Sequence, residues 1–354
     1  MINDLMEAFS SFTSLLFAVS SLFRRPGNTT MDQHSPDNKH EDGLGRNLHI
    51  GKPAWLKTKI PTGENYFWLK RSMRARKLAT VCEEAKCPNI ATCWNERTAT
   101  FMVLGDTCTR ACRFCHVKTG WPLVPGRPEE AWEVAQSCVE MKLTHAVITM
   151  VDRDDLPDGG ADHLCGVVRT AKQALPSLTV ELLVGDFRGK VEAIDAILPA
   201  QPEIWGHNLE TVARLTPRVR DARATYQQSL EMLAHAKARA PYPLLTKSAL
   251  MLGLGETQAE VIATMKDLRA HHVDLLTIGQ YMRPSKKHLA IKAWIPPEVF
   301  DELALEARNL GFLGVAATPL ARSSFRAHHL YSQALAARTL TATAASNQQG
   351  LPRS

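Results

Sequence analysis

The stretch ATFMVLGDTCTRACRFCHVKTG (residues 99–120) joins a short apolar run to a loop that carries three cysteines. The apolar run over 99–105 has the length and side chains of a buried strand. Cys108, Cys112 and Cys115 follow it with the spacing C-x3-C-x2-C. Short loops of this kind hold iron–sulfur clusters, because soft thiolate ligands suit iron. Three thiolates leave one iron of a [4Fe–4S] cubane without a cysteine, so the loop predicts a cluster with one open coordination position.

The rest of the chain alternates between strand-like and helix-like segments. Further strand-like runs cover residues 144–150, 178–184, 203–208, 244–253 and 273–279, and helix-like stretches cover residues 128–142, 161–174, 190–199, 223–239 and 256–270. This alternation predicts parallel strands joined by right-handed helical crossovers. Six units are fewer than the eight of a closed barrel. We therefore expect an α/β fold, a partial (β/α)6 barrel related to the TIM barrel, with its site at the C-terminal ends of the strands.

Composition and charge narrow the classes of protein that fit. The chain has 354 residues, of which 45% are hydrophobic and 22% charged, and its net charge is +6. A balance this small is far from a nucleic-acid footprint. The apolar run over residues 9–23 is too short to span a membrane, and acidic residues precede it, which argues against a signal peptide. We expect no nucleic acid partner, no membrane span and a cytoplasmic location, with organelle targeting by the first 30 residues as the weaker alternative.

A second group of three cysteines lies just upstream of the first. Cys82, Cys87 and Cys93 have the spacing C-x4-C-x5-C, so six of the eight cysteines fall between residues 82 and 115. Disulfide frameworks belong mainly to small secreted chains, whereas clustered cysteines in a large chain more often bind metal. One cluster accounts for the first triad only. The second triad therefore needs its own explanation.

The two triads and the segments around them resemble the lipoyl synthase family of radical S-adenosylmethionine (SAM) enzymes. The resemblance covers roughly residues 50 to 335. It is carried by CEEAKCPNIATCWNERTATFMVLGDTCTRACRFCHVKTG (82–120), VDRDDLPDGGADH (151–163), TKSALMLGLGET (246–257) and PLARSSFRA (319–327). It implies a radical SAM barrel with N- and C-terminal extensions and the activity of a sulfurtransferase.

The resemblance also implies the cofactors and the reaction. SAM and two [4Fe–4S] clusters are expected, one cluster on each triad, with Ser324 as the fourth ligand of the second, auxiliary cluster and as a catalytic residue. An adenosyl radical made from SAM would remove hydrogen from C6 and C8 of an octanoyl-lysine. Sulfide from the auxiliary cluster would then be inserted at both carbons to give the lipoyl cofactor. A serine oxygen is a poorer match for iron than a thiolate, which fits a cluster that is dismantled.

Further partners and SAM contacts follow from the same resemblance. The octanoylated carrier would be a lipoyl domain, either of a 2-oxoacid dehydrogenase E2 or of the glycine cleavage H protein. An electron donor such as ferredoxin or flavodoxin and an iron–sulfur carrier protein are also expected. The residues expected to contact SAM are Gly159, Gly160, Asn208, Glu210 and Arg220. Each has a plainer interpretation as well: a turn for the glycines, a helix cap for Asn208 and Glu210, and a solvated basic surface for Arg220.

The predicted organisation has five parts: a disordered or targeting-like tail (1–45), an extension with the second triad (46–97), the barrel (98–290), a segment with the RSS motif (291–335) and a flexible tail (336–354). Two other functions remain open from the residues alone. One is a radical SAM enzyme that uses its second cluster for electron transfer. The other is a non-catalytic scaffold that carries zinc or a cluster and binds a partner.

Overall fold

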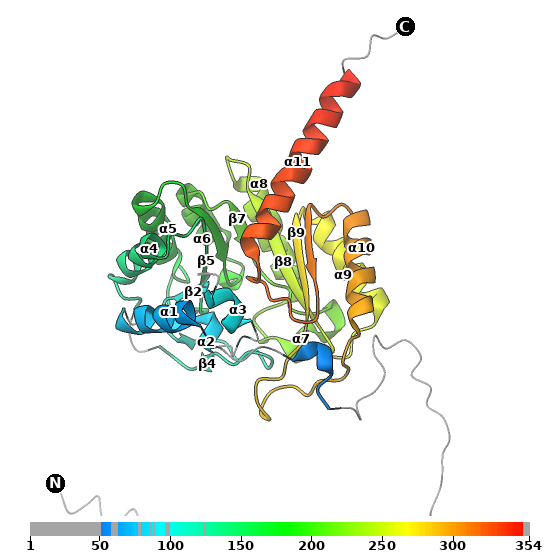
Figure 1. Cartoon of the computed structure of the whole chain (residues 1–354), viewed down its shortest axis with the longest axis horizontal. Helices are drawn as coiled ribbons and strands as arrows, with labels where there is room; N and C mark the ends of the chain where they lie inside the picture. The colour runs from blue at the N-terminus through cyan, green and yellow to red at the C-terminus, as the bar shows by residue number, and fades with distance from the viewer. Residues whose placement is uncertain are drawn as a thin grey trace, which may run out of the picture. The chain divides into compact units, whose positions relative to one another are not determined.

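The centre of the protein is an eight-stranded sheet in the order β1-β2-β5-β6-β7-β8-β9-β10 (Figure 1). A computed structural model describes residues 51–57, 63–76, 79–84, 87, 89–95, 100–122 and 125–349, so the predicted tail over 1–45 lies outside it. The strands are β1 (Ala79–Thr80), β2 (Thr100–Val103), β5 (His145–Met150), β6 (Thr179–Leu183), β7 (Ile204–Gly206), β8 (Leu245–Leu252), β9 (Leu275–Gln280) and β10 (Gly314–Ala317). All six strands predicted from the sequence are present.

The sheet is parallel throughout except at one edge. Strands β2 to β10 pair in parallel register, and β1 pairs with β2 in the antiparallel direction. The two end strands, β1 and β10, do not pair with each other, so the sheet forms an open barrel as expected. Strand β10, with the sequence GVAA, was not predicted because it is short and has only one β-branched residue.

Helices connect consecutive strands in the predicted pattern. The five predicted crossover helices are α4 (Glu130–Glu140), α5 (Ala161–Ala174), α6 (Val191–Ile197), α8 (Tyr226–Arg239) and α9 (Gln258–Ala270). A further helix, α10 (Pro297–Asn309), joins β9 to β10. The short helical turns are α7 (Thr216–Val219) and the 3-10 helices at Ala54–Leu56, Phe187–Gly189, Leu198–Ala200 and Ala213–Leu215. The start of α9 shows why the chain turns helical there. Thr257 and Glu260 form a reciprocal capping box, which satisfies two free backbone N–H groups.

The interior of the barrel holds an ion pair. Lys247 of β8 donates from Nζ to both carboxylate oxygens of Glu181 of β6, each at 2.8 Å. Strand β7 lies between β6 and β8, so the two side chains meet across the inside of the barrel. Both are almost completely buried, at 1% and 0% exposure. Burial of a charge is tolerated here because the partner charge is within hydrogen-bond distance.

The last helix, α11 (Ala327–Gln349), covers the end of the barrel away from the cysteine loop. Its Leu330 and Ala334 pack against Ile204, Leu245 and Leu275 at the beginnings of three strands. The helix continues beyond the sheet (Figure 1). Residues 336–349, which were predicted as part of a flexible tail, are helical, and the flexibility of this segment stays a prediction. The stretch ALAARTLTATAA is rich in alanine and leucine, which favour helix even without a clear apolar face.

The N-terminal extension is a small helical layer beside β1 and β2. It consists of α1 (Glu64–Ala75), α2 (Val81–Glu84) and α3 (Ile90–Asn95). Tyr66 of α1 and the fully buried Trp94 of α3 pack with ring centroids 5.1 Å apart. Because β1 ends at Thr80, its pairing with β2 places Cys82 at the edge of the sheet.

Within the described residues, no helix has the length and apolar character needed to cross a membrane.

Candidate active site

A cavity of about 610 Å³ opens at the C-terminal ends of the strands, where the site was predicted. Its walls include residues at or near the strand ends, such as Thr149, Leu183, Ala249 and Thr277. All three cysteines of the first triad line it, and so do Cys82 and Cys87 of the second. The two triads, which are separate in the sequence, thus reach one shared space.

The loop of the first triad is closed at its base by a two-stranded pairing. Strand β3 (Thr107–Cys108) pairs with β4 (Lys118–Thr119), and the N–H of Gly120 donates to the carbonyl of Cys108 at 3.0 Å. The far side of the loop contacts the segment after β9. His288 Nε2 is 2.9 Å from the carbonyl oxygen of Cys115, and its ring stacks on that of His116.

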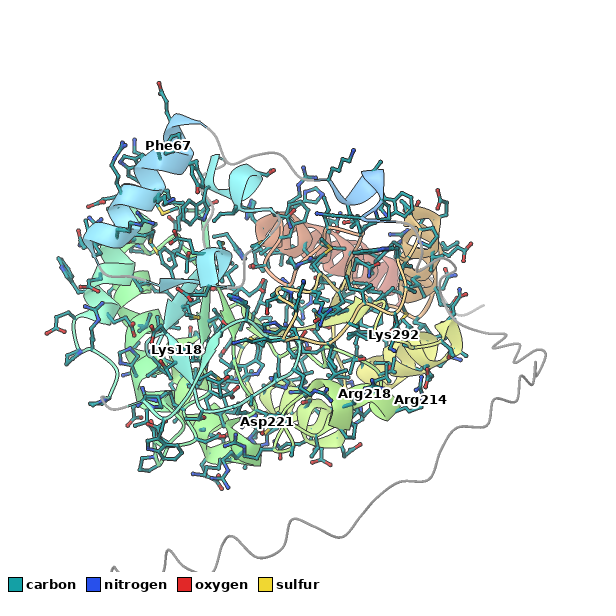
Figure 2. The ribbon with its side chains drawn as sticks, turned by 90° about the horizontal axis from the view of Figure 1, so that it is seen from below. Phe67, Lys118, Arg214, Arg218, Asp221 and Lys292 are labelled. Atoms are coloured by element: carbon teal, nitrogen blue, oxygen red, sulfur yellow. The ribbon has the colours of Figure 1, made fainter. Side chains whose placement is uncertain are left out.

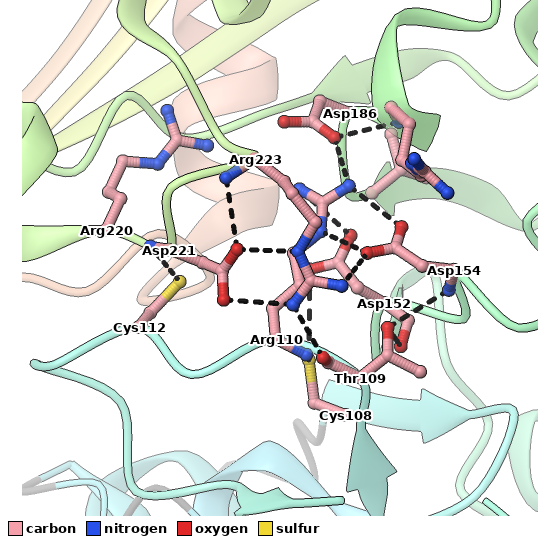
Figure 3. A network of polar contacts seen from close by, with 12 residues as sticks. Cys108, Thr109, Arg110, Cys112, Asp152, Asp154, Asp186, Arg220, Asp221 and Arg223 are labelled. Carbon is pink, nitrogen blue, oxygen red and sulfur yellow. Dashed lines mark hydrogen bonds and ion pairs between the residues drawn. The ribbon is translucent and has the colours of Figure 1, made fainter. Parts of the chain in front are cut away.

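Arg110, between the first two cysteines of the loop, is the centre of a buried polar network (Figure 3). Its Nε and Nη2 donate to the two oxygens of Asp154, both at 3.0 Å, and Nη2 also contacts Asp186 at 2.5 Å. Asp152 lies 3.7 Å from its Nη1. Asp152 and Asp154 follow β5, and Asp186 follows β6. The guanidinium therefore ties the cysteine loop to the ends of two strands.

A second set of contacts fastens the same loop to the segment after α7 (Figure 3). Asp221 accepts a hydrogen bond from the N–H of Ala111 at 2.9 Å, and its own N–H lies 3.3 Å from the sulfur of Cys112. Arg223 donates to the carbonyl of Thr109 at 2.8 Å and also pairs with Asp154 at 3.0 Å. The four aspartates of this network, Asp152, Asp154, Asp186 and Asp221, were not identified from the sequence as part of the site. They come from three distant segments, so no local pattern marks them.

Asp152 is a carboxylate of this network that lies close to the first triad. Its Oδ2 is 3.9 Å from the sulfur of Cys108, and it lines the cavity. Burial raises the pKa of Asp152 to about 6, partly offset by the charge of Arg110. Gly185 leaves the room for it, because a Cβ at that position would lie 2.0 Å from Asp152 Oδ1.

The second triad lies where the open barrel has its gap. A small pocket is lined by Cys82, Cys87, Cys93 and Ser324, together with Arg322. The cysteines follow the edge strand β1, and the RSS segment follows β10, the other edge strand. The side chain of Asn89 links the cysteine segment to the RSS segment, because it donates a hydrogen bond to the carbonyl oxygen of Leu320 at 2.7 Å. The sequence-predicted serine and its three cysteines are therefore brought together.

The thiols of the two triads are free, and burial shifts their titration. None of them forms a disulfide. Burial raises the pKa of Cys82, Cys108 and Cys115 to about 11 and that of Cys112 to about 12. These groups stay protonated until a metal displaces the proton.

Among the described residues, no three His, Cys, Asp or Glu side chains converge on a single ion position. In a zinc site every thiolate lies about 2.3 Å from one ion, whereas in a cubane each binds a different iron.

The expected SAM contacts fall into two groups. Asn208, Glu210 and Arg220 line the cavity. Arg220 is held by Ser229 and lies next to the buried His207. Gly159 and Gly160 are not among the lining residues; both have positive φ in the turn that starts α5, and a Cβ on Gly160 would lie 2.4 Å from Leu104. Their contact with SAM stays a prediction, as do the roles of the other three.

Comparison with known proteins identifies the family. Residues 102–268 match the family model of the radical SAM superfamily, and residues 25–87 match that of the N-terminal domain of lipoyl synthase. Lipoyl synthase from Thermus thermophilus is 51% identical over 283 residues, which is 80% of this chain and 87% of that protein. The chain belongs to the lipoyl synthase family. A mitochondrial lipoyl synthase from Eremothecium gossypii is likewise 51% identical, over 79% of this chain and 76% of its own length.

A solved structure supports the fold assignment. The crystal structure of HydG, a maturase of the [FeFe]-hydrogenase, superposes with a TM-score of 0.51 at 16% identity, covering 72% of this chain and 57% of that one. As a member of the lipoyl synthase family, this chain is an enzyme of radical SAM chemistry, and SAM and a [4Fe–4S] cluster are the cofactors of that superfamily. The alternative of a non-catalytic scaffold is thereby removed.

Proposed function

We propose that the enzyme inserts sulfur at C6 and C8 of an octanoyl chain carried on a lysine, and that the sulfur comes from a second [4Fe–4S] cluster on Cys82, Cys87, Cys93 and Ser324. The observation that carries this proposal is the shared cavity. Cysteines of both triads line it, and so does Ser324. A reaction that takes a radical from one centre and sulfur from the other needs the substrate to reach both, and one cavity provides this.

The chain's own residues would bind, orient and exclude water. When bound, SAM and the first cluster supply an adenosyl radical, and the second cluster supplies sulfide. Cys108, Cys112 and Cys115 would hold the first cluster, and Arg220 and Glu210 offer opposite charges for the carboxylate and amino groups of SAM. The lining of the cavity includes Ile90, Phe114 and Met251, which suit an acyl chain. An apolar wall also keeps water away from a carbon radical.

Ser324 is the residue that distinguishes the two possible roles of the second cluster, sulfur donation and electron transfer. It lines both the small pocket and the main cavity. A serine oxygen binds iron less well than a thiolate, so it is suited to release iron while the cluster is dismantled. A permanent electron-transfer cluster would gain from a fourth cysteine. We therefore assign Ser324 as the ligand that leaves first.

The carrier is proposed to be an octanoylated lipoyl domain that presents an acidic surface. The segment after β9, residues 281–297, contains Arg283, Lys286, Lys287 and Lys292 and no Asp or Glu. All four side chains are exposed, and Arg283 also lines the cavity. Lys292 lies on the same side of the protein as Lys118 and Arg218 (Figure 2). A positive surface beside the cavity opening favours an anionic partner over a cationic one.

The proposal is tested by labelling the sulfur. The protein is reconstituted anaerobically with iron and sulfide enriched in a heavy sulfur isotope. It is then mixed with SAM, a reductant and an octanoyl-lysine carrier peptide, and the product is read by mass spectrometry. We expect two heavy sulfur atoms per converted chain. Unlabelled sulfur in the product, with both clusters confirmed, would contradict donation from the protein's own cluster.

The variant Ser324→Cys distinguishes sulfur donation from electron transfer by the second cluster. A fourth thiolate should hold the second cluster more firmly, so sulfur insertion should fall while SAM cleavage continues. If the second cluster only passed electrons, turnover would survive this change.

A further inference from the structure

Arg322 lies at the wall between the two cavities. It lines the small pocket of the second triad, together with Cys87 and Ser324, and it also lines the main cavity. It comes two residues before Ser324, directly after the stretch that Asn89 holds through the carbonyl of Leu320. Only part of the side chain is accessible, and the pockets it lines provide that access.

The guanidinium has few partners within the protein. Among the described residues it makes one hydrogen bond, from Nη1 to the carbonyl oxygen of Ala321 at 2.5 Å, and no ion pair. An arginine carries five N–H donors. Most of them are therefore left to face the pockets. Removing a cation from water without a partner is costly, so a half-buried arginine in this position points to a ligand of opposite charge.

The backbone is built to leave space for this side chain. At Gly279, near the end of β9, an added Cβ would lie 3.1 Å from Arg322 Nη1 and only 2.1 Å from the carbonyl oxygen of Ala321. Glycine is therefore needed at position 279 for the chain to approach so closely. The close approach fixes where the guanidinium lies.

Each triad has an arginine whose charge acts on one of its thiols: Arg220, which is buried, for the first triad and Arg322, which is half-buried, for the second. The charge of Arg220 acts on Cys112 of the first triad, and the charge of Arg322 acts on Cys87 of the second. Glu210 is the other titratable group that acts on Arg322, but it does not reach ion-pair distance. Arg220 is available on the first-triad side for the SAM carboxylate. Arg322 is the arginine available to a ligand held by the second triad.

We propose that Arg322 is a positioning residue for the auxiliary cluster: it faces that cluster, donates N–H hydrogen bonds to it and balances part of its negative charge. This inference rests on the proposed function for the presence of a cluster on the second triad. Three thiolates and a serine oxygen leave such a cluster with net negative charge. Net charge and hydrogen bonds to sulfur are the main factors that set the potential of a cluster, and both effects of Arg322 raise it.

The experiment uses the full chain with the first triad removed by Cys108→Ala, Cys112→Ala and Cys115→Ala, so that only the second cluster is loaded. Iron content is measured first, and then the reduction potential with and without Arg322→Gln. We expect the glutamine variant to have a lower potential and to lose iron to a chelator about 10-fold faster. The variant Arg322→Lys, which keeps the charge without the planar fork, should lie between the two.

Arg326→Gln is the matched control, because it removes the same charge from the same segment but at an exposed position. It should leave the potential unchanged. Melting of the iron-free protein provides a second readout: a merely structural arginine would lower the melting temperature when replaced, whereas loss of a cation without a partner should not. If Arg322→Gln and its parent both bind iron and have the same reduction potential, the inference about Arg322 is wrong, whereas the proposed auxiliary cluster stands. A complete absence of iron in the parent overturns the proposed auxiliary cluster as well.

Discussion

Arg110, in the loop of the first triad, and Asp154 form a bidentate ion pair, in which Nε donates to Oδ2 and Nη2 donates to Oδ1, both at 3.0 Å. A bidentate pair fixes direction as well as distance. Because Arg110 lies between Cys108 and Cys112, the direction of this one side chain fixes the path of the loop. The loop is therefore oriented by the ends of β5 and β6.

Replacing Arg110 by lysine should weaken the first cluster. The charge is kept, but the planar fork to Asp154 and the contact with Asp186 cannot both be made. We expect a loss of about 10- to 100-fold in cluster affinity or SAM cleavage, as for other residues that orient metal ligands. Chelation kinetics and cleavage of SAM without substrate provide the measurements. Arg214→Lys is the control, because Arg214 makes the same fork with Glu260 on the surface, where such a pair contributes about 0–1 kcal/mol.

Gly279→Ala should displace the RSS segment. A Cβ would lie 2.1 Å from the carbonyl oxygen of Ala321, which is backbone and cannot rotate away. A shift of about 1 Å in Ser324 or Arg322 should reduce sulfur insertion about 100-fold. SAM cleavage by the first cluster should be largely retained, and this separates the effect from unfolding. Gly166→Ala in α5 is the control: its Cβ meets nothing within 4 Å, so it should stabilise by about 0.5–1 kcal/mol.

Breaking the pair between Lys247 and Glu181 should destabilise the barrel strongly. Either Lys247→Met or Glu181→Gln removes one partner of the buried ion pair, and we expect a loss of about 3–5 kcal/mol in the free energy of unfolding. The double replacement by apolar residues should recover most of the loss. Denaturant unfolding of the iron-free protein measures all three variants. Lys172 and Glu203 form a more exposed pair at 2.6 Å, and Lys172→Met should cost much less. Equal losses at the two pairs would contradict the role assigned to burial.

His207 should make the protein sensitive to acid. Burial, reinforced by the charge of Arg220, lowers the pKa of His207 to about 4. Between that value and its ordinary pKa the unfolded chain binds a proton that the folded protein does not. Stability therefore falls as the pH drops from about 6.5 to 4, by about 3 kcal/mol from this group. His207→Gln should remove that part of the slope.

The quantity to follow with pH is the difference in the free energy of unfolding between the parent protein and His207→Gln. Asp152, with its pKa raised to about 6, contributes with the opposite sign: the folded protein binds its proton more tightly than the unfolded chain, so this part of the stability grows as the pH falls. Urea unfolding at several pH values between 4 and 7 gives the two curves. Parallel curves would show that His207 does not titrate as its surroundings require.

Elements with a clear local pattern could be predicted, and contacts between distant segments could not. The runs at 144–150 and 178–184 became β5 and β6 nearly residue for residue, since alternation of short apolar runs with amphipathic stretches leaves little choice of topology. The cysteine spacing and the RSS motif predicted which residues would be ligands, and that assignment stays a prediction. Asp186 could not be identified, although it lies in GDFRGK, a stretch with a superficial likeness to a phosphate loop. Its partner Arg110 is 76 residues away in the sequence.

Only Phe325 and Arg326 separate Ser324 from the first residue of α11, the helix that fills the opposite end of the barrel. A premature stop codon shortly after position 326 would therefore uncover the apolar side chains of Ile204, Leu245 and Leu275 and release the neighbouring serine from its anchor. Alleles truncated in this region should behave as null alleles, even though every cysteine of both triads is still translated.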